Sequence, residues 1–226
     1  YTGWASFQAP HAVRVDDHEL QADHILIAPG GRPTVPDIPG PQLGITRHGF
    51  FELDHQPQST LVVGAGYIAT ELAGVLNSLG TEVTMLLRKK TLLKEFDATL
   101  GETLMTEMRA AGIKILTEVR LQEIRTEPDG TLSIIHDADQ TTTGFDSVLW
   151  AIGREPLTAG LNLDHAGVRV DTEGFIPTDK YQCTNVGRVY AVGDVTGRQA
   201  LTPVAIAAGR RLADRLYGGH ANAHLD

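Results

Sequence analysis

Short apolar runs alternate with amphipathic stretches through the middle of the chain. The predicted elements, in order, are a strand at 60–63, a helix at 68–79 stopped by Gly80, a strand at 82–87, a helix at 99–112 and a strand at 113–116. The first strand does not alternate polar and apolar positions, which suits a parallel strand buried on both faces. The pattern therefore predicts β-α-β-α-β, half of a doubly wound parallel sheet.

Further strands are predicted on both sides of this unit. They are expected at 13–15, 18–20, 24–28, 121–126, 131–136, 147–152 and 189–192, with a hairpin turn at Asp129-Gly130 and a last helix that begins at Thr202-Pro203. The segment 121–136 is expected to be an antiparallel appendage that returns to the parallel sheet at 147–152. Thr99 and Glu102 have the spacing of a capping box. The Pro- and Gly-rich run 29–33 is expected to have no regular structure.

A stiff connector between Pro36 and Pro41 is a candidate domain boundary. It marks a boundary near residue 41, and the 226 residues are sufficient for one large core or two modest ones. The predicted fold class is α/β, with a Rossmann-like nucleotide-binding domain whose parallel sheet carries an antiparallel β-meander.

Composition and charge exclude several classes of function. A single cysteine, Cys183, cannot form an internal disulfide, a redox dithiol or a Cys-based zinc finger. The net charge of −9 disfavours a nucleic-acid binder but allows a local basic patch for a small phosphorylated ligand. No apolar run approaches the ~20 residues that span a bilayer, and no signal-peptide pattern is present, so we expect a cytoplasmic protein. His220 and His224 lie in a polar tail, and no metal site is predicted.

The loop Gly64-Ala65-Gly66-Tyr67-Ile68-Ala69 fits G-x-G-x-x-G/A directly after a predicted strand and at the start of a predicted helix. Gly64 would permit a tight turn, Gly66 would let the backbone approach a pyrophosphate, and Ala69 would allow close packing of helix on strand. The helix N-terminus would add free N–H groups and partial positive charge. The alternative is a glycine-rich turn that binds nothing.

Arg88 follows the second predicted strand, 22 positions after Gly66. A site for NAD would place an acid here to accept from the ribose hydroxyls, whereas a basic residue accommodates a 2′-phosphate. Lys94 adds a positive charge from the following loop. NADPH is therefore the expected coenzyme, and the alternative is a solvated charge run at 88–90.

Five segments resemble the FAD-dependent pyridine nucleotide–disulfide oxidoreductases, and within that family the glutathione reductases. They are GAGYIATELAG at 64–74, APGGRP at 28–33, WAIGREP at 150–156, YAVGDV at 190–195 and LTPVAIAAGR at 201–210. The order of these segments along nearly the whole chain makes the resemblance to the family specific. It implies hydride transfer from NADPH to FAD and on to a disulfide, here glutathione disulfide, in an enzyme that is a homodimer.

The resemblance also implies roles around the coenzyme. The implied NADPH-lining residues are Ala65, Ile68, Arg88, Lys94 and Gly153, with Arg88 and Lys94 on the 2′-phosphate. Tyr67 would be a lid over the nicotinamide pocket that swings away when NADPH arrives. Glu71 would pair near the flavin with a lysine that family members carry in an N-terminal region, which this sequence does not include. Without such roles, Tyr67 is an ordinary packed tyrosine and Glu71 an acid in the first turns of a helix.

For the flavin, the resemblance implies that Asp194 holds the ribityl chain and that Thr202 contacts the edge of the isoalloxazine. Gly3 and Gly30 would make backbone contacts to FAD. Arg210 resembles the arginine with which glutathione reductases hold a carboxylate of glutathione disulfide. The alternative for Arg210 is a surface arginine near the C-terminal end of a helix.

Departures from the family pattern limit what this chain is expected to do. Lys94 stands where many members have Arg, and Pro29 where they have Thr. A first G-x-G-x-x-G loop for FAD, a Cys-x4-Cys pair and an interface domain with a His–Glu pair are not found in the sequence. The resemblance therefore implies the central part of a reductase that binds nucleotide without disulfide turnover. It implies an NADPH domain at 41–153, flanked by partial pieces of an FAD domain at 1–40 and 154–226. The alternatives are a mercuric- or lipoamide-type reductase, an NADPH-dependent flavoprotein oxidase, or a stand-alone nucleotide-binding module without flavin.

Overall fold

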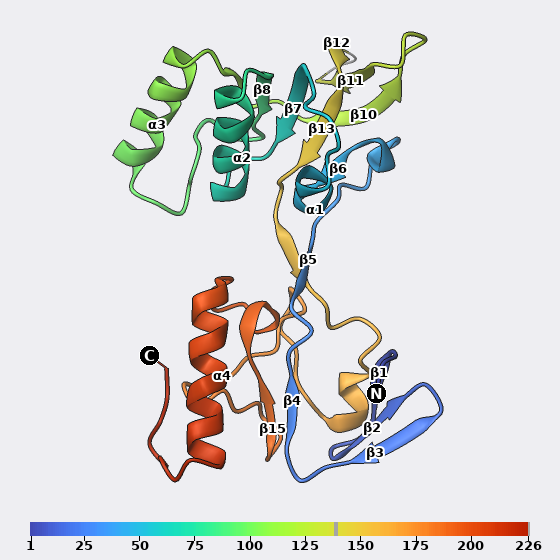
Figure 1. Ribbon diagram of the computed structural model, residues 1–226, viewed down its shortest axis with the longest axis vertical. Coiled ribbons are helices and arrows are strands. Elements are labelled where there is room, and N and C mark those ends of the chain that lie inside the picture. Colours follow the sequence, from blue (N-terminus) through green and yellow to red (C-terminus); the bar gives the residue numbers. More distant parts are fainter. Residues whose placement is uncertain (138–139, 226) are drawn as a thin grey trace. The chain divides into compact units, whose positions relative to one another are not determined.

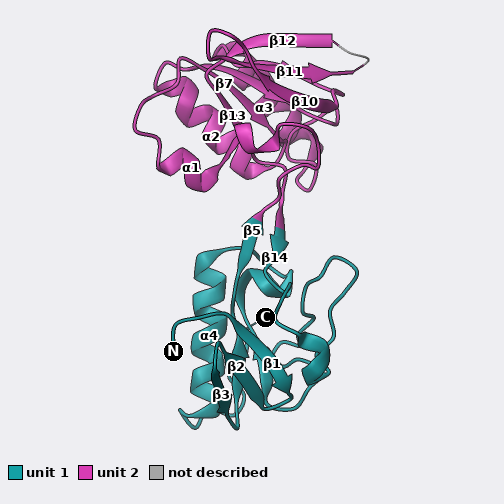
Figure 2. Ribbon diagram, turned by 90° about the vertical axis from the view of Figure 1, so that its right-hand side faces the viewer, with its two compact units in different colours: residues 1–32, 155–226 teal, residues 33–154 magenta. Residues whose placement is uncertain are grey.

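The computed structural model describes residues 1–137 and 140–225 and divides the chain into two compact units. Unit 1 consists of Tyr1–Arg32 and Glu155–Asp226, and unit 2 of Pro33–Arg154 (Figure 2). The chain passes from one unit to the other through β5 (Gly31–Pro33) and β14 (Arg154–Pro156), which form a two-stranded sheet. The expectation of no regular structure at 29–33 is wrong, because a distant segment supplies β5 with a pairing partner.

Unit 2 is built on a five-stranded parallel sheet in the order β6-β13-β7-β8-β9. Its strands are β6 (Ile45–Thr46), β13 (Ser147–Trp150), β7 (Ser59–Val63), β8 (Glu82–Leu86) and β9 (Lys114–Leu116). The helices of the unit are α1 (Arg47–Phe51), α2 (Tyr67–Ser78) and α3 (Ala98–Ala110), after a short 3-10 turn at Pro41–Leu43. The β-α-β-α-β prediction for 60–116 and the α/β fold class are confirmed.

The central strands of this sheet are covered on both faces, as their apolar sequences require. Val62, Met85 and Leu149 pack with the buried faces of α2 and α3. Side chains on the opposite face pack against an antiparallel sheet of β10 (Leu121–Thr126), β11 (Leu132–His136) and β12 (Gln140–Phe145). Figure 1 shows the helices and this antiparallel sheet around the parallel strands. The predicted antiparallel appendage is confirmed, and its return strand is β13.

The proline-rich connector belongs to unit 2 by its contacts. Pro39 accepts a hydrogen bond from the Ile124 amide at 3.0 Å, and a Cβ on Gly40 would lie 2.1 Å from the Ile124 carbonyl oxygen. Trp150, which is buried, donates from Nε1 to the Pro41 carbonyl at 2.9 Å. The compact unit therefore begins at Pro33, eight residues before the expected boundary at 41. The assignment of the three regions to FAD and NADPH stays a prediction.

Unit 1 contains an antiparallel sheet and a two-stranded parallel sheet. The first comprises β1 (Ala5–Ala9), β2 (Ala12–Val15) and β3 (His18–Gln21), and the second comprises β4 (Ile25–Ile27) and β15 (Val189–Ala191). Helix α4 (Thr202–Leu216) covers β15 through Ala208 and Leu212, as Figure 1 shows. Short 3-10 turns occur at Leu163–Ala166 and Gly193–Thr196. Pro203 lies in the first turn of α4, as predicted.

Several short elements were not predicted, among them β1, β12 and α1 as well as β6 and β14. Strand β1 is paired to β2 across a bulge, β12 carries three threonines, and α1 is only five residues long. Each has weak hydrophobic periodicity, because pairing or packing with the rest of the unit decides its structure. Threonine is nevertheless a strand former, and the Thr141–Thr143 run was the signal that could have identified β12.

The start of α3 differs from the capping box predicted at Thr99 and Glu102. The N-cap residue is Asp97, whose carboxylate accepts a hydrogen bond from the Thr99 amide at 2.9 Å. The helix therefore begins one residue before Thr99, because an aspartate in extended conformation reaches the N2 amide directly.

Replacement of the cap provides a test of this correction. We expect Asp97→Ala to lower the free energy of unfolding by about 1 kcal/mol, since one amide at the helix start loses its partner. Glu102→Ala is the matched control and should change it by less than about 0.5 kcal/mol. Urea denaturation followed by circular dichroism measures both, and an equal loss in the two variants would contradict the assignment.

Candidate functional site

The predicted coenzyme residues of unit 2 gather at one edge of the parallel sheet. The glycine loop follows β7, Arg88 follows β8, and Gly153 follows β13. These three strands are adjacent and parallel, so their carboxyl ends meet at the same edge. From β7 the chain continues to β8 and β9 on one side of β7, whereas β13 lies on the other side of β7. The strand order therefore reverses at β7, and ligands of doubly wound sheets bind at the carboxyl ends of the strands at such a switch point.

Gly64 allows two of these segments to approach closely. Its φ is +143°, and a Cβ on it would lie 2.1 Å from the carbonyl oxygen of Ala151. The Gly64 amide donates to Leu86 at 3.1 Å, and the Ala151 amide donates to Val63 at 2.9 Å. Any larger residue would separate the loop from the segment after β13. Glycine is thus required at position 64 by the positive φ and by the close approach of the Ala151 backbone.

Gly66 differs from Gly64 because it lies in open space. It is exposed, is the N-cap of α2 with φ −86°, and a Cβ on it would meet no atom within 4 Å. The first amides of α2 are therefore accessible to a ligand. Ala69 is fully buried in the core between α2 and the sheet. The two glycines and the alanine have the properties that a pyrophosphate loop requires.

The loop that carries Lys94 lies against the glycine loop. The amide of Leu93, which has φ +51°, donates to the Ala65 carbonyl at 2.8 Å. Lys94 forms an exposed ion pair with Glu95 at 2.9 Å, and this contact lowers the pKa of the Glu95 carboxyl. Arg88 is exposed, and within residues 1–137 and 140–225 no carboxylate pairs with it. The hydrogen bond from the Leu93 amide to the Ala65 carbonyl was not predicted, since it joins backbone atoms and does not depend on either side chain.

Tyr67 and Glu71 lie four residues apart on the first turns of α2, so they share one face of the helix. Tyr67 is 41% exposed and Glu71 is also exposed. Tyr67 is therefore not an ordinary packed tyrosine. Ile68 is half-buried against the core of the unit. Gly153 has φ +139°, and its carbonyl accepts from the Thr34 amide at 3.0 Å.

The predicted flavin residues lie in unit 1, and two of them meet at one edge. Gly30 follows β4 and Asp194 follows β15 by three residues each, and these strands pair in parallel. The Val192 amide donates to the Ile27 carbonyl at 3.2 Å and continues the pairing toward this edge. Gly30 has φ +76° with open space where a Cβ would lie. Asp194 is half-buried at the start of a 3-10 turn.

The other residues predicted for flavin and disulfide lie at different places in unit 1. Thr202 is exposed at the start of α4, and this helix packs against the turn that carries Asp194. Arg210 is exposed eight residues further, about 12 Å along the helix axis. Gly3 lies beside Asp16, where a Cβ would be 2.1 Å from the carboxylate. Asp16 belongs to the turn between β2 and β3.

Cys183 lies beside Arg215 rather than in a reactive cleft. Its Sγ is 3.9 Å from the guanidinium, which also donates to the Tyr181 carbonyl and stacks 5.2 Å from the Tyr181 ring. Burial raises the pKa of the thiol, Asp179 raises it further, and Arg215 acts in the opposite direction. These contacts are those of a structural thiol.

The raised pKa predicts slow alkylation of Cys183. Because the thiolate is the nucleophile, the native chain at pH 8 should react with iodoacetamide at least about fivefold more slowly than the chain in urea. The rate should rise as the pH increases through the raised pKa. Mass spectrometry of quenched samples measures this, and equal rates in the native and unfolded chains would contradict the argument.

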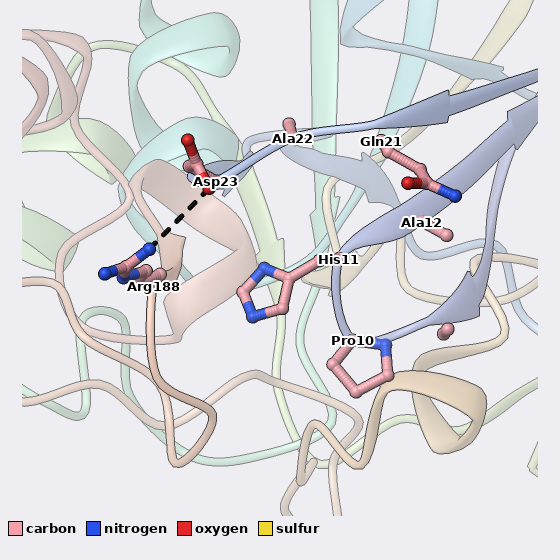
Figure 3. Close-up of a pocket in the computed structure, with 8 residues that line it drawn as sticks. Pro10, His11, Ala12, Gln21, Ala22, Asp23 and Arg188 are labelled. Atoms are coloured by element: carbon pink, nitrogen blue, oxygen red, sulfur yellow. Dashed lines mark ion pairs between the residues drawn. The ribbon is translucent and has the colours of Figure 1, made fainter.

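A hollow with a volume of about 600 Å³ lies elsewhere in unit 1 (Figure 3). It is formed by the β1–β2 turn, the end of β3 and Arg188, which pairs with Asp23 at 3.7 Å. Both side chains of this pair are mostly exposed. None of the residues predicted for NADPH or FAD lines this hollow, so it provides no support for either site.

No helix within residues 1–137 and 140–225 is long and apolar enough to cross a membrane. In the same residues, no group of three or more His, Cys, Asp or Glu side chains could hold a metal ion. The His224 Nδ1–H donates to the Asn222 carbonyl at 2.7 Å, and the ring lies edge-on to Tyr181.

The parallel sheet of unit 2 has the architecture of a doubly wound nucleotide-binding sheet. The chain belongs to the pyridine nucleotide-disulphide oxidoreductase family, whose model matches residues 1–209. Members of this family use FAD and NADPH, the two cofactors that were predicted.

Relatives place the chain among glutathione-reductase-like proteins. It is 47% identical over 233 residues to a glutathione reductase of Schizosaccharomyces pombe, covering 100% of this chain and 50% of the relative. It is 40% identical over 229 residues to a glutathione reductase of Yarrowia lipolytica, covering 96% and 48%. The chain thus spans about half the length of these relatives.

A solved structure supports the same family. The HOCl-induced flavoprotein disulfide reductase RclA from Escherichia coli superposes with a TM-score of 0.87 at 29% identity, covering 96% of this chain and 50% of that one. The resemblance inferred from the five sequence segments is confirmed.

Proposed function

We propose that this chain is the nucleotide-binding part of an NADPH-dependent glutathione-disulfide reductase. The observation that carries the proposal is the open edge of the unit 2 sheet, where Gly66, the start of α2 and Arg88 lie at adjacent strand ends. The glutathione reductases that match over the whole chain favour glutathione disulfide as the substrate of the complete enzyme. That enzyme would be a homodimer.

The residues of unit 2 fit a pyridine dinucleotide. Gly64, Gly66 and Ala69 would admit the pyrophosphate to the N-terminus of α2, where backbone amides and the helix dipole favour an anion. Ala65, Ile68 and Gly153 would line the site. Arg88 would hold the 2′-phosphate through its planar fork. Lys94 would leave its ion pair with Glu95 and pair with the 2′-phosphate instead.

The lid and acid roles are proposed for the exposed face of α2. Tyr67 stands at the first position of the helix with its ring accessible, so it can cover a bound nicotinamide or turn away from it. Glu71, one turn further, would orient a cation close to the flavin. Within the described residues no cation pairs with Glu71, which leaves its carboxylate available for that role.

The edge in unit 1 fits part of an FAD site. Gly30 offers backbone in open space, and Asp194 presents a carboxylate that can accept from ribityl hydroxyls. Thr202 would contact the isoalloxazine from the start of α4, Gly3 would add a backbone contact, and Arg210 would hold a carboxylate of the substrate. When bound, the two cofactors supply the redox chemistry, and the protein binds and orients them. With one cysteine, this chain alone should not reduce glutathione disulfide.

Titration with NADPH and NADH is the decisive experiment. Purified chain should bind NADPH at least about tenfold more tightly than NADH, as measured by quenching of Trp fluorescence or by calorimetry. Equal affinities would overturn the proposal that Arg88 and Lys94 bind the 2′-phosphate.

The colour of the purified chain tests whether it retains flavin. A yellow preparation indicates retained flavin, whereas a colourless one that binds NADPH indicates a nucleotide-binding module without flavin. Measurable glutathione disulfide reduction by the chain alone would contradict the proposal that it lacks turnover.

A further inference from the structure

The lysine proposed for the 2′-phosphate has an acidic neighbour in the sequence. Lys94 and Glu95 are consecutive, and Lys94 Nζ lies 2.9 Å from Glu95 Oε1. Lys94 lowers the pKa of the Glu95 carboxyl, first through a hydrogen bond and then through its charge, and the charge of Lys89 lowers it further. A carboxylate of the chain itself is therefore paired with the ammonium group that would bind the phosphate.

A tight turn presents this ion pair. The Phe96 amide donates to the Leu93 carbonyl at 2.8 Å, so that Lys94 and Glu95 are the two central residues of a β-turn. The two side chains are 62% and 76% exposed. A coenzyme can therefore reach the lysine, but only in competition with the carboxylate beside it.

The turn is anchored on both sides. Before it, Leu92 is buried in the core with residues of α2 and α3, and the Leu93 amide donates to the Ala65 carbonyl of the glycine loop at 2.8 Å. After it, Asp97 caps the start of α3. The acid is thus held beside the glycine loop and within reach of the lysine.

Arg88 differs from Lys94 in this respect. It is exposed after β8, and no carboxylate pairs with it in the part of the chain that the structure describes. Arg88 can therefore meet a phosphate without losing an ion pair, whereas Lys94 has to exchange one anion for another. Exposed Lys–Glu pairs are weak, so the exchange is possible. It nevertheless subtracts from what the lysine gains by binding the phosphate.

We propose that Glu95 is a positioning residue that acts through Lys94 and limits the selectivity for NADPH over NADH. In the absence of coenzyme it holds the ammonium group, and the 2′-phosphate has to displace it. NADH has no 2′-phosphate and does not require Lys94, so its affinity is independent of this exchange. This role rests on the proposed function, because it concerns the selectivity of the same site.

Glu95→Gln is the direct test. The variant should bind NADPH about fivefold more tightly than the unchanged chain, because Lys94 no longer has to leave an ion pair and a negative charge near the phosphate is removed. The affinity for NADH should change by less than about twofold. Fluorescence titration with each coenzyme measures both. The ratio of the two affinities is the decisive quantity, since a general change in the fold would alter both.

Two further variants serve as controls. Glu107→Gln removes the same charge at an exposed position near the other end of α3 and should leave both affinities unchanged within about twofold. Glu95→Asp keeps the carboxylate and should keep the ratio within about twofold of that of the unchanged chain. A gain in NADPH affinity that is equal in Glu95→Gln and Glu107→Gln would be an effect of net charge and would overturn the proposal.

The Lys94→Gln chain tests whether Glu95 acts through the lysine. In that background Glu95→Gln should raise the affinity for NADPH by less than about twofold, since no ammonium group remains to be released. A fivefold gain that persists without the lysine would overturn the proposed route.

The same titrations separate this role from the proposed function. If the unchanged chain prefers NADPH and Glu95→Gln leaves that preference unchanged or lowers it, the role of Glu95 is overturned and the proposed function stands. If neither chain distinguishes NADPH from NADH, both are overturned.

Discussion

Arg88→Glu should weaken NADPH at least about 100-fold while it changes the affinity for NADH by less than about threefold. The arginine lies two residues after β8, at the strand edge that carries the glycine loop, and is exposed. Its replacement removes a bidentate partner of the 2′-phosphate and adds a repelling charge. A glutamate there can also accept from the ribose hydroxyls of NADH. The preference between coenzymes should therefore disappear or reverse.

Lys114→Glu is the matched control for this change. It makes the same change of charge at an exposed position, but Lys114 begins β9 and is not at the carboxyl end of a strand. Fluorescence titration of both variants with both coenzymes should show a specific effect of Arg88. If Lys114→Glu weakens NADPH as strongly as Arg88→Glu does, the effect is one of net charge, and the phosphate site is not where we propose.

Gly64→Ala should lower the free energy of unfolding by about 3 kcal/mol or more. The new Cβ would lie 2.1 Å from the Ala151 carbonyl oxygen and 2.7 Å from its carbon, and the backbone at φ +143° resists any L side chain. Since both contacts are with backbone, no rotamer change relieves them. The β7 and β13 ends would have to separate. Thermal denaturation should show a decrease of roughly 10 °C in the melting temperature of the unit.

Gly66→Ala separates stability from binding. Its Cβ would enter open space and its φ is normal for alanine, so the free energy of unfolding should change by at most about 1 kcal/mol. The affinity for NADPH should nevertheless decrease about tenfold, because the methyl group lies where the pyrophosphate approaches. Equal loss of stability in the two alanine variants would refute this division of roles.

The sequence predicted elements that carry their own signal. The helices α2 and α4 and the strands β7, β8 and β15 are defined by apolar periodicity, Gly and Pro. Residues whose role depends on distant partners were not predicted. The pairing of β5 with β14, the cap at Asp97 and the contact of Leu93 with Ala65 all depend on which segments the tertiary structure brings together.

The residues of the candidate sites also fall into those that the sequence indicates and those whose contacts depend on the tertiary structure. Chain order was sufficient to place Gly64, Gly66 and Arg88 at one edge, because parallel strands fix where their ends lie. Lys94 was predicted to add a positive charge to the site, and its ion pair with Glu95 was not predicted.

The connectivity of the two units has a consequence for the order of folding. Unit 2 is one continuous stretch, Pro33–Arg154, whereas unit 1 is assembled from two segments that this stretch separates. An unfolded stretch of that length imposes an entropic cost on joining the segments that flank it. Once unit 2 has folded, β5 and β14 hold its two ends side by side. Unit 2 is thus an inserted domain whose own folding supplies the short connection through which residues 1–32 and 155–226 find each other.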